Sequence, residues 1–276
     1  MEITNTVIVP DMFMSANWSK ENQMADLFTS GLKVGVRGFD TAREYKVEKQ
    51  VGKALKTALT KTSLKREDIF VQTRISNEEI IKGNIKDEVM RSLDAMGMEY
   101  FDCFMFHWPT PPNHYINAWH KLIEVFEDTE LVRSIGMCNC RIRHLERIRQ
   151  ECKIMPHVLQ VEVTPFWQVK ELKSYCDEKG IIMQGFSPLC KMIEPIRKNK
   201  ILLALADKYG VSIPQIILRW NYQRNIRPIS LSQKIERVES NFNIWDFDLN
   251  DFDMKMISEL DCGYKYHLES ATCAGY

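Results

Sequence analysis

The sequence is poor in glycine and has no glycine-rich phosphate-binding turn. Only 12 of its 276 residues are glycine, and none forms the G-x-G-x-x-G pattern typical of doubly wound nucleotide-binding sheets. Long hydrophobic runs are also missing, because no segment approaches the roughly 20 apolar residues of a membrane-spanning helix. The sequence therefore argues against a Rossmann-type fold and against a membrane protein.

An excess of charge of one sign is absent as well. Lys plus Arg and Asp plus Glu are balanced at 37 each, so no net field attracts nucleic acid or an anionic membrane. The eight cysteines are scattered, and no second Cys/His pair at zinc spacing completes a metal site with Cys138 and Cys140. The N-terminus lacks the pattern of a secretory signal. We expect a cytoplasmic protein with reduced thiols, monomeric or weakly homo-oligomeric, that acts on a small molecule.

What the sequence does have is a regular alternation of short apolar runs and longer amphipathic segments. The strand candidates are residues 11–16, 38–42, 68–75, 101–107, 132–139, 157–163, 180–187 and 226–232. Helix candidates include residues 46–59, 84–98, 116–129, 144–152, 199–210 and 212–225. Strands separated by helices favour parallel pairing, and eight such units in this length predict an α/β fold, a (β/α)8 TIM barrel that forms a single domain over residues 1–276.

Polar residues stand at the predicted ends of three consecutive strands. Asp40 ends the second strand and Tyr45 follows it, Arg74 ends the third, and His107 ends the fourth. Taken singly, such residues are more often turn, rim or core residues than catalysts. The C-terminal strand ends carry the chemistry of a barrel of this kind, so the four together predict a proton-donating site.

Arg74 needs an anionic partner, because arginine is rarely buried unpaired. Asp40 on the neighbouring strand is the expected partner. We also expect the cation to lower the pKa of the Tyr45 phenol, which is otherwise a poor acid at neutral pH.

Seven stretches resemble an aldo-keto reductase when read in order. They are GFDTAREY, FVQTRIS, FMFHWP, SIGMCN, LQVEVTPF, GFSPL and SLSQKIERVESNF, and they span roughly residues 12–262. The sequence resembles especially the compact bacterial diketogluconate reductase and prostaglandin F synthase-like branches. The resemblance implies a catalytic tetrad of Asp40, Tyr45, His107 and Arg74, with Tyr45 as proton donor to a carbonyl and Arg74 where the family has lysine. A guanidinium supports the phenol electrostatically but does not relay a proton, so altered rather than lost chemistry is expected.

The resemblance also implies a nicotinamide cofactor. Asn139 and Gln160 match the residues that hold the carboxamide, and Cys138 replaces the usual serine beside the asparagine. Phe186 replaces the tyrosine that stacks on the nicotinamide, and Ser187 and Leu189 follow in the pyrophosphate stretch. In the segment that holds the adenosine 2′-phosphate, the expected positions fall on Leu231, Ser232, Arg237 and Asn241. Leu231 stands where a lysine is usual, so NADPH is the first choice of cofactor and NADH remains possible.

Two tryptophans are candidates for the substrate pocket. Trp18 matches the rim at the first strand end, and Trp108 follows His107, although ordinary barrel packing accounts equally well for Trp108. The resulting prediction is an NAD(P)H-dependent oxidoreductase that reduces a small aldehyde, ketone or keto sugar. The alternative is a cofactor-binding regulatory or low-activity barrel with a degenerate tetrad.

Overall fold

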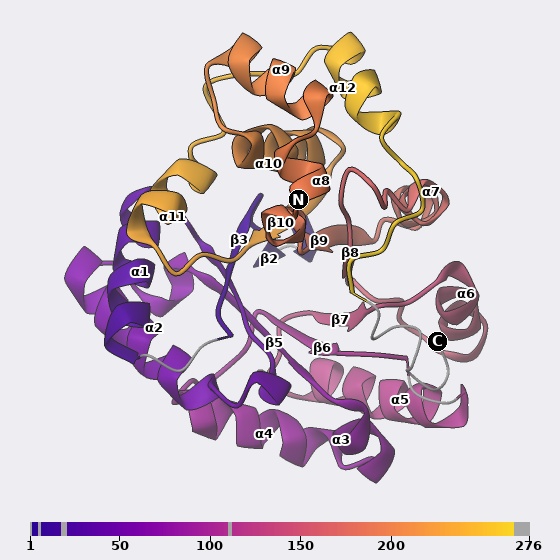
Figure 1. Ribbon diagram of the computed structural model, residues 1–276. Helices are drawn as coiled ribbons and strands as arrows, with labels where there is room; N and C mark the ends of the chain where they lie inside the picture. The colour runs from indigo at the N-terminus through magenta and orange to yellow at the C-terminus, as the bar shows by residue number, and fades with distance from the viewer. Residues whose placement is uncertain (1, 5–6, 18–20, 110–111, 268–276) are drawn as a thin grey trace.

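Eight parallel strands close into a barrel in the computed structural model, which describes residues 2–4, 7–17, 21–109 and 112–267 (Figure 1). Around the barrel the order is β10, β3, β4, β5, β6, β7, β8 and β9. Their bounds are β3 Phe13–Ser15, β4 Gly38–Asp40, β5 Phe70–Ile75, β6 Cys103–Phe106, β7 Ile135–Cys138, β8 Val158–Glu162, β9 Ile182–Phe186 and β10 Ile226–Ser230. Each strand lies inside a predicted strand segment.

Helices surround the barrel and connect successive strands (Figure 1). The longer ones are α1 Glu21–Lys33, α2 Glu48–Thr62, α4 Ile85–Met96, α5 Pro112–Asp128, α6 Ile142–Glu151, α7 Lys170–Lys179, α9 Lys200–Tyr209 and α10 Ile213–Gln223. Shorter helical segments are α3 Asn77–Lys82, α8 Glu194–Arg197, α11 Ile235–Phe242 and α12 Asp251–Ser258, together with the 3-10 turns η1 Arg43–Tyr45, η2 Arg66–Asp68 and η3 Cys190–Met192. Helices α1 and α7 were not among the sequence predictions.

Local chemistry sets several helix boundaries. The Asn199 side chain accepts from the backbone N–H groups of Ile201 and Leu202 and so starts α9. Gly210, at φ 64°, ends the same helix in the left-handed conformation that glycine adopts without strain. These boundaries fix the length of α9, which packs against α10.

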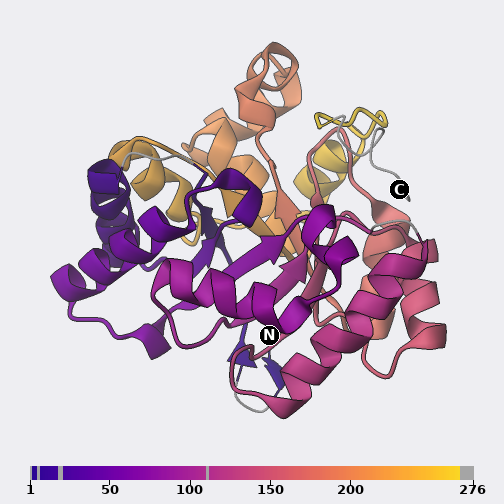
Figure 2. The same ribbon diagram turned by 90° about the horizontal axis from the view of Figure 1, so that it is seen from below.

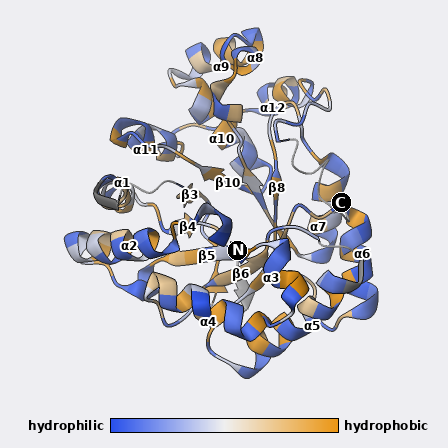
Figure 3. Cartoon of the chain, turned by 60° about the horizontal axis from the view of Figure 1, so that its bottom comes forward, coloured by the Kyte–Doolittle hydropathy of each residue, from blue (hydrophilic) through white to orange (hydrophobic). Residues whose placement is uncertain are grey.

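The strand alternation divides the core in two. Outward-facing residues such as Phe104 and Leu159 pack against the helices, and Figure 3 shows hydrophobic colour on the helix faces turned to the barrel. Inward-facing residues such as Phe13, Phe70 and Met105 fill the barrel interior. Above this apolar filling, the inward positions nearer the C-terminal strand ends become polar, which is where the site forms.

A short antiparallel hairpin covers the N-terminal end of the barrel. It consists of β1 Glu2–Thr4 and β2 Val7–Ile8, and the sequence reading did not anticipate it. Val7 and Val9 are buried and belong to the interior cluster. Figure 2 shows the hairpin at the opposite end of the molecule from the C-terminal stretch.

Within the described residues, no single helix has the length and apolar character needed to cross a membrane. The sharply bent pair α9 and α10 passes that test jointly, by length and composition alone.

Candidate active site

The four predicted catalytic residues meet at the C-terminal end of the barrel. Asp40 ends β4, Tyr45 ends η1, Arg74 lies in β5, and His107 directly follows β6. The Arg74 guanidinium bridges two of them, because Nη1 donates to Asp40 Oδ1 at 2.7 Å and Nη2 donates to Tyr45 Oη at 2.8 Å. The expected contact between Arg74 and Asp40 is therefore confirmed.

The Arg74–Asp40 pair is almost completely buried. Arg74 is 3% exposed and Asp40 is 2% exposed, so both charges have lost most of their water. Burial acts to lower the pKa of Arg74, but the neighbouring groups, Asp40 first and Tyr45 next, together outweigh it and raise the arginine pKa above its ordinary value. Arg74 thus stays cationic, and a buried pair of this kind holds its geometry because separating the partners strands a charge.

Arg74 acts to lower the pKa of the Tyr45 phenol, as expected, but the net shift is upward. Burial raises the pKa of Tyr45 above its ordinary value of 10, and the opposing effect of Arg74 is too small to reverse the shift. The physical reason is that the phenol has lost most of its water, and the nearby Asp40 carboxylate adds to the upward shift. Tyr45 is consequently protonated at neutral pH, the form that donates a proton.

His107 lies between an acidic and an aromatic neighbour. Its Nδ1 is 2.9 Å from Oε2 of Glu44, an approach outside regular hydrogen-bond alignment. The Trp108 ring lies 6.2 Å from the His107 ring, with the planes 23° apart. Burial lowers the pKa of His107. Glu44 was missed by the sequence reading, since it reads as an ordinary exposed residue beside Tyr45.

Asp40 is held by more than arginine. Its Oδ1 also accepts from Gln72 Nε2 at 2.7 Å and from Gln160 Nε2 at 3.0 Å, and its Oδ2 accepts from Ser15 Oγ at 3.3 Å. The Gln72 and Gln184 amides exchange two hydrogen bonds at 2.8 and 2.9 Å. Neither Gln72 nor Gln184 was predicted, although each occupies an inward position of an otherwise apolar strand.

Asn139 and Gln160, the residues expected to hold the carboxamide, use their amide nitrogens for hydrogen bonds within the protein. Asn139 Nδ2 donates to the His107 carbonyl at 2.9 Å, and Gln160 Nε2 donates to Asp40 and Gln184. Among the described residues no side chain or backbone group donates to their side-chain oxygens, which suits these oxygens to accept from a ligand. Cys138 lies lower in the barrel, 1% exposed with its sulfur 3.9 Å from that of Met105, and burial raises its pKa to about 12, so it is a neutral thiol.

His267, near the C-terminal end of the described chain, contacts Ser187, one of the residues predicted to bind the cofactor pyrophosphate. His267 Nε2 is 2.7 Å from Ser187 Oγ, and its ring packs edge-on against Phe186 at 5.6 Å. The backbone N–H groups of Tyr266 and His267 donate to the buried Glu162 carboxylate at 2.6 and 2.9 Å. Leu189 follows as the cap of η3. Ser187 has a left-handed backbone with φ 49°, a strained conformation often found in ligand-binding loops.

The segment expected to bind the 2′-phosphate follows β10. Leu231 is 40% exposed, Ser232 Oγ accepts from the Lys234 N–H at 3.2 Å, and Arg237 is exposed on α11. Asn241 instead faces inward and donates to Ser230 Oγ at 3.0 Å. Lys234, which the sequence reading passed over, is a second cation at the start of α11.

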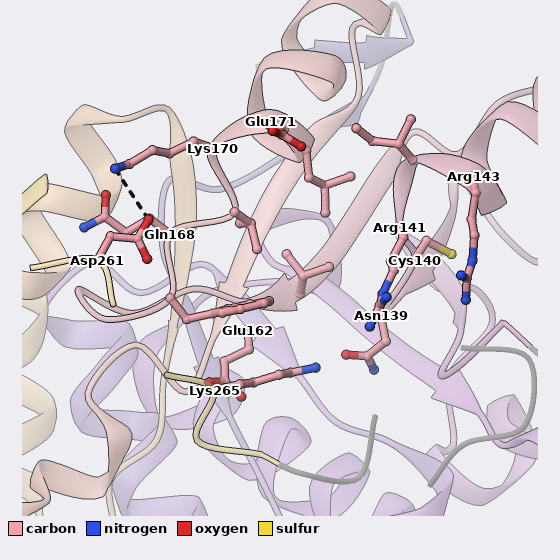
Figure 4. Close-up of a pocket in the computed structure, with 15 residues that line it drawn as sticks. Asn139, Cys140, Arg141, Arg143, Glu162, Gln168, Lys170, Glu171, Asp261 and Lys265 are labelled. Carbon is pink, nitrogen blue, oxygen red and sulfur yellow. Dashed lines mark ion pairs between the residues drawn. The ribbon is translucent and has the colours of Figure 1, made fainter. Parts of the chain in front are cut away.

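A cavity of about 660 Å³ opens beside this site, between the starts of α6 and α7 (Figure 4). Asn139 and Glu162 line it, and Arg141, Arg143 and Lys265 add positive charge. The tetrad-type side chains are not among its lining residues. Trp18, predicted for the pocket rim, lies outside the described residues.

Comparison with known proteins gives a consistent result. A model of the aldo/keto reductase family matches residues 14–261. The chain is 33% identical to the methylglyoxal reductase DkgA of Escherichia coli O157:H7 over 257 residues, which cover 93% of this chain and 91% of that protein. It is 32% identical to the glyoxal reductase of Bacillus subtilis (strain 168) over 240 residues, which cover 87% and 84% of the two chains.

Solved structures share the barrel. MGS-M4, an aldo-keto reductase from a Medee basin deep-sea metagenome library, matches with a TM-score of 0.88 and 29% identity over 95% of this chain and 94% of that chain. The predicted (β/α)8 barrel and the predicted carbonyl-reducing oxidoreductase are thereby confirmed. The chain belongs to the aldo/keto reductase family.

Proposed function

We propose that the protein reduces small 2-oxoaldehydes and related aldehydes or ketones with hydride from NADPH, and that Tyr45 donates the proton. The observation that carries the proposal is the Arg74 bridge, which joins the buried Asp40 carboxylate to the Tyr45 hydroxyl at the mouth of the barrel. The substrate class is supported by the similarity to a methylglyoxal reductase and a glyoxal reductase.

In this proposal Tyr45 protonates the carbonyl oxygen, and a nicotinamide held by Asn139, Gln160 and Phe186 would supply the hydride to the carbonyl carbon. Arg74 stabilises the phenolate that remains, because its Nη2 already donates to the phenol oxygen at 2.8 Å. Asp40 keeps Arg74 in place. Proton return to Tyr45 comes from water, since a guanidinium does not give up its proton in proteins.

The chain's own groups fit a nicotinamide. The free amide oxygens of Asn139 and Gln160 suit the NH₂ group of its carboxamide, and the Phe186 ring offers a stacking surface. For the adenosine end we propose Ser232 and Arg237 as phosphate contacts, with Lys234 supplying the cation that Leu231 lacks. Asn241 has a supporting role behind them. NADPH is therefore favoured over NADH.

The experiment that tests the proposal follows NADPH consumption with methylglyoxal and compares the parent with Tyr45→Phe. Loss of the proton donor lowers kcat by roughly 10²- to 10⁴-fold, with NADPH binding retained. Tyr175→Phe is the matched control, because Tyr175 bonds Glu146 on the outer helices. NADPH binding without turnover by the parent would instead favour the cofactor-binding, low-activity alternative.

Two further assignments belong to the same proposal. The cysteines of the described residues are free thiols, which fits the reducing cytoplasm. We expect a monomer or a weak homo-oligomer, and sedimentation at several protein concentrations tests this.

A further inference from the structure

Arg43 begins η1, the short 3-10 turn that carries Tyr45, and its guanidinium contacts a helix outside the barrel. Nη2 donates to the backbone carbonyl of Glu88 at 2.7 Å and to Ser92 Oγ at 2.5 Å, and both partners lie on α4. Nη1 forms an ion pair with the Glu88 carboxylate. The Glu88 side chain is 4% exposed and that of Arg43 is 15% exposed, so water competes little for these contacts. The arginine therefore fastens the turn to α4.

A second set of contacts joins Arg43 to the strand that carries Arg74. Its Nε lies 3.6 Å from Oε2 of Glu48, at the start of α2. The other oxygen of this carboxylate, Oε1, accepts from Thr73 Oγ1 at 2.9 Å, and Thr73 directly precedes Arg74 in β5. Glu48 is 7% exposed and Thr73 is fully buried. Side-chain contacts therefore link the turn that carries Tyr45 to the strand that carries its hydrogen-bond partner.

The turn itself does little to hold Tyr45 in place. Its backbone hydrogen bonds run from Tyr45 N to the Ala42 carbonyl at 3.1 Å and from Lys46 N to the Arg43 carbonyl at 2.9 Å. A single 3-10 turn of this kind depends on contacts with its surroundings. The tolerance is small, because Tyr45 Oη lies 2.8 Å from Arg74 Nη2 and a hydrogen bond is lost once its atoms separate to about 3.6 Å. A shift of the turn by about 1 Å is enough to break the contact.

We propose that Arg43 is a positioning residue, which holds the Tyr45 hydroxyl within hydrogen-bond distance of Arg74 by fastening η1 to α4 and, through Glu48, to β5. The inference rests on the proposed function, in which Tyr45 donates the proton. Arg43 acts only through Tyr45 and takes no part in binding the cofactor.

The test begins with Arg43→Met, which keeps the length of the side chain but removes its charge and its donors. With methylglyoxal and NADPH, kcat is expected to fall by roughly ten- to hundredfold, because the proton donor is no longer held in place. The KM for NADPH is expected to stay within about twofold of the parent, since the residues proposed to hold the cofactor follow or belong to β7, β8, β9, β10 and α11.

Arg66→Met is the matched control at the other end of the barrel. Arg66 precedes β5, is 21% exposed in its side chain, and donates to the Tyr100 carbonyl at 2.9 Å and to the Asp102 carboxylate at 2.7 Å. Both variants are expected to unfold at lower urea concentrations than the parent, but only Arg43→Met is expected to lose kcat. An equal loss of kcat in the two variants overturns the proposal, because it shows a general loosening of the barrel.

A double-mutant cycle with Tyr45→Phe separates positioning from an independent effect. When Tyr45 is already absent, Arg43→Met is expected to lower the remaining kcat by less than about twofold, because residues that act as a unit do not give additive losses. The same ten- to hundredfold loss in both backgrounds overturns the proposal.

If Arg43→Met does not fold, Arg43→Lys enters the same measurements. Its ammonium can keep the ion pair with Glu88 but cannot reproduce the fork of a guanidinium, so kcat is expected to fall by roughly three- to tenfold. A kcat within about twofold of the parent, in whichever variant folds, overturns the role of Arg43 and leaves the proposed function standing. A parent that does not reduce methylglyoxal overturns both.

Discussion

Arg74 donates a 2.8 Å hydrogen bond to the Tyr45 hydroxyl through one guanidinium nitrogen while the other nitrogen of its fork holds Asp40. A lysine has a single nitrogen for both partners. In the proposed tetrad, the arginine therefore supplies the electrostatic link between Asp40 and Tyr45 through a wider, planar group.

Arg74→Lys is expected to lower kcat by roughly tenfold, which corresponds to about 1.4 kcal/mol of barrier. The reason is that the shorter ammonium cannot keep both the Asp40 and the Tyr45 contacts in this barrel. Steady-state kinetics with methylglyoxal check the change, and NADPH binding should be unaffected. A rise of tenfold would mean that arginine impairs the site.

The pH profile of reduction should report Tyr45. Its pKa is raised above 10 by burial, and the donor form exists below that pKa, so kcat/KM for reduction falls only as pH rises through it. Arg74 acts to lower this pKa, so Arg74→Met moves the descending limb to still higher pH. If kcat/KM instead declines at a pH well below 10, and Arg74→Met does not move that decline, Tyr45 is excluded as the donor.

Leu231→Lys is expected to tighten NADPH binding by roughly tenfold and to leave NADH binding unchanged. The added ammonium lies in the loop before α11 and meets the 2′-phosphate that NADH lacks. Quenching of tryptophan fluorescence measures both affinities. Ile81→Lys adds the same charge at another exposed position on α3 and should tighten neither.

His267→Ala is expected to tighten NADPH binding by roughly two- to tenfold. The imidazole contacts the Ser187 hydroxyl that the pyrophosphate would use, and losing one hydrogen bond is worth about 0.5–1.5 kcal/mol. Tyr264→Ala, in the same stretch, tests for a general loosening and should leave the affinity unchanged. Weaker binding in His267→Ala would show that the histidine helps to hold the cofactor.

Gln72→Met is expected to lower the free energy of unfolding by about 1–3 kcal/mol. The thioether keeps the volume of the side chain but leaves the buried Gln184 amide without its reciprocal partner and Asp40 with one donor fewer. Urea denaturation measures the loss. Gln50→Met on the surface of α2 is the matched control, and equal stability of the two variants would contradict the network.

The sequence predicted the barrel because strand length, apolar character and spacing are local properties. It also predicted that Asp40, Tyr45, Arg74 and His107 lie near one another, through their positions at strand ends. The hydrogen-bonded pair Gln72 and Gln184 was not predicted, because the two residues are 112 positions apart and the sequence around each gives no sign of the contact. The net upward shift of the Tyr45 pKa was not predicted for a related reason: it depends on how much water the folded site excludes from the phenol.

The β1–β2 hairpin closes the N-terminal end of the barrel interior. Val7 is 4% exposed and Val9 is 1% exposed, so this end of the interior is lined by buried apolar side chains. Among the described residues, the apolar interior that includes Phe13, Phe70 and Met105 lies between this hairpin and the polar layer around Asp40. Under the proposed function, a cofactor and substrate bound at the C-terminal strand ends would therefore limit the exchange of water and protons with the polar layer around Asp40.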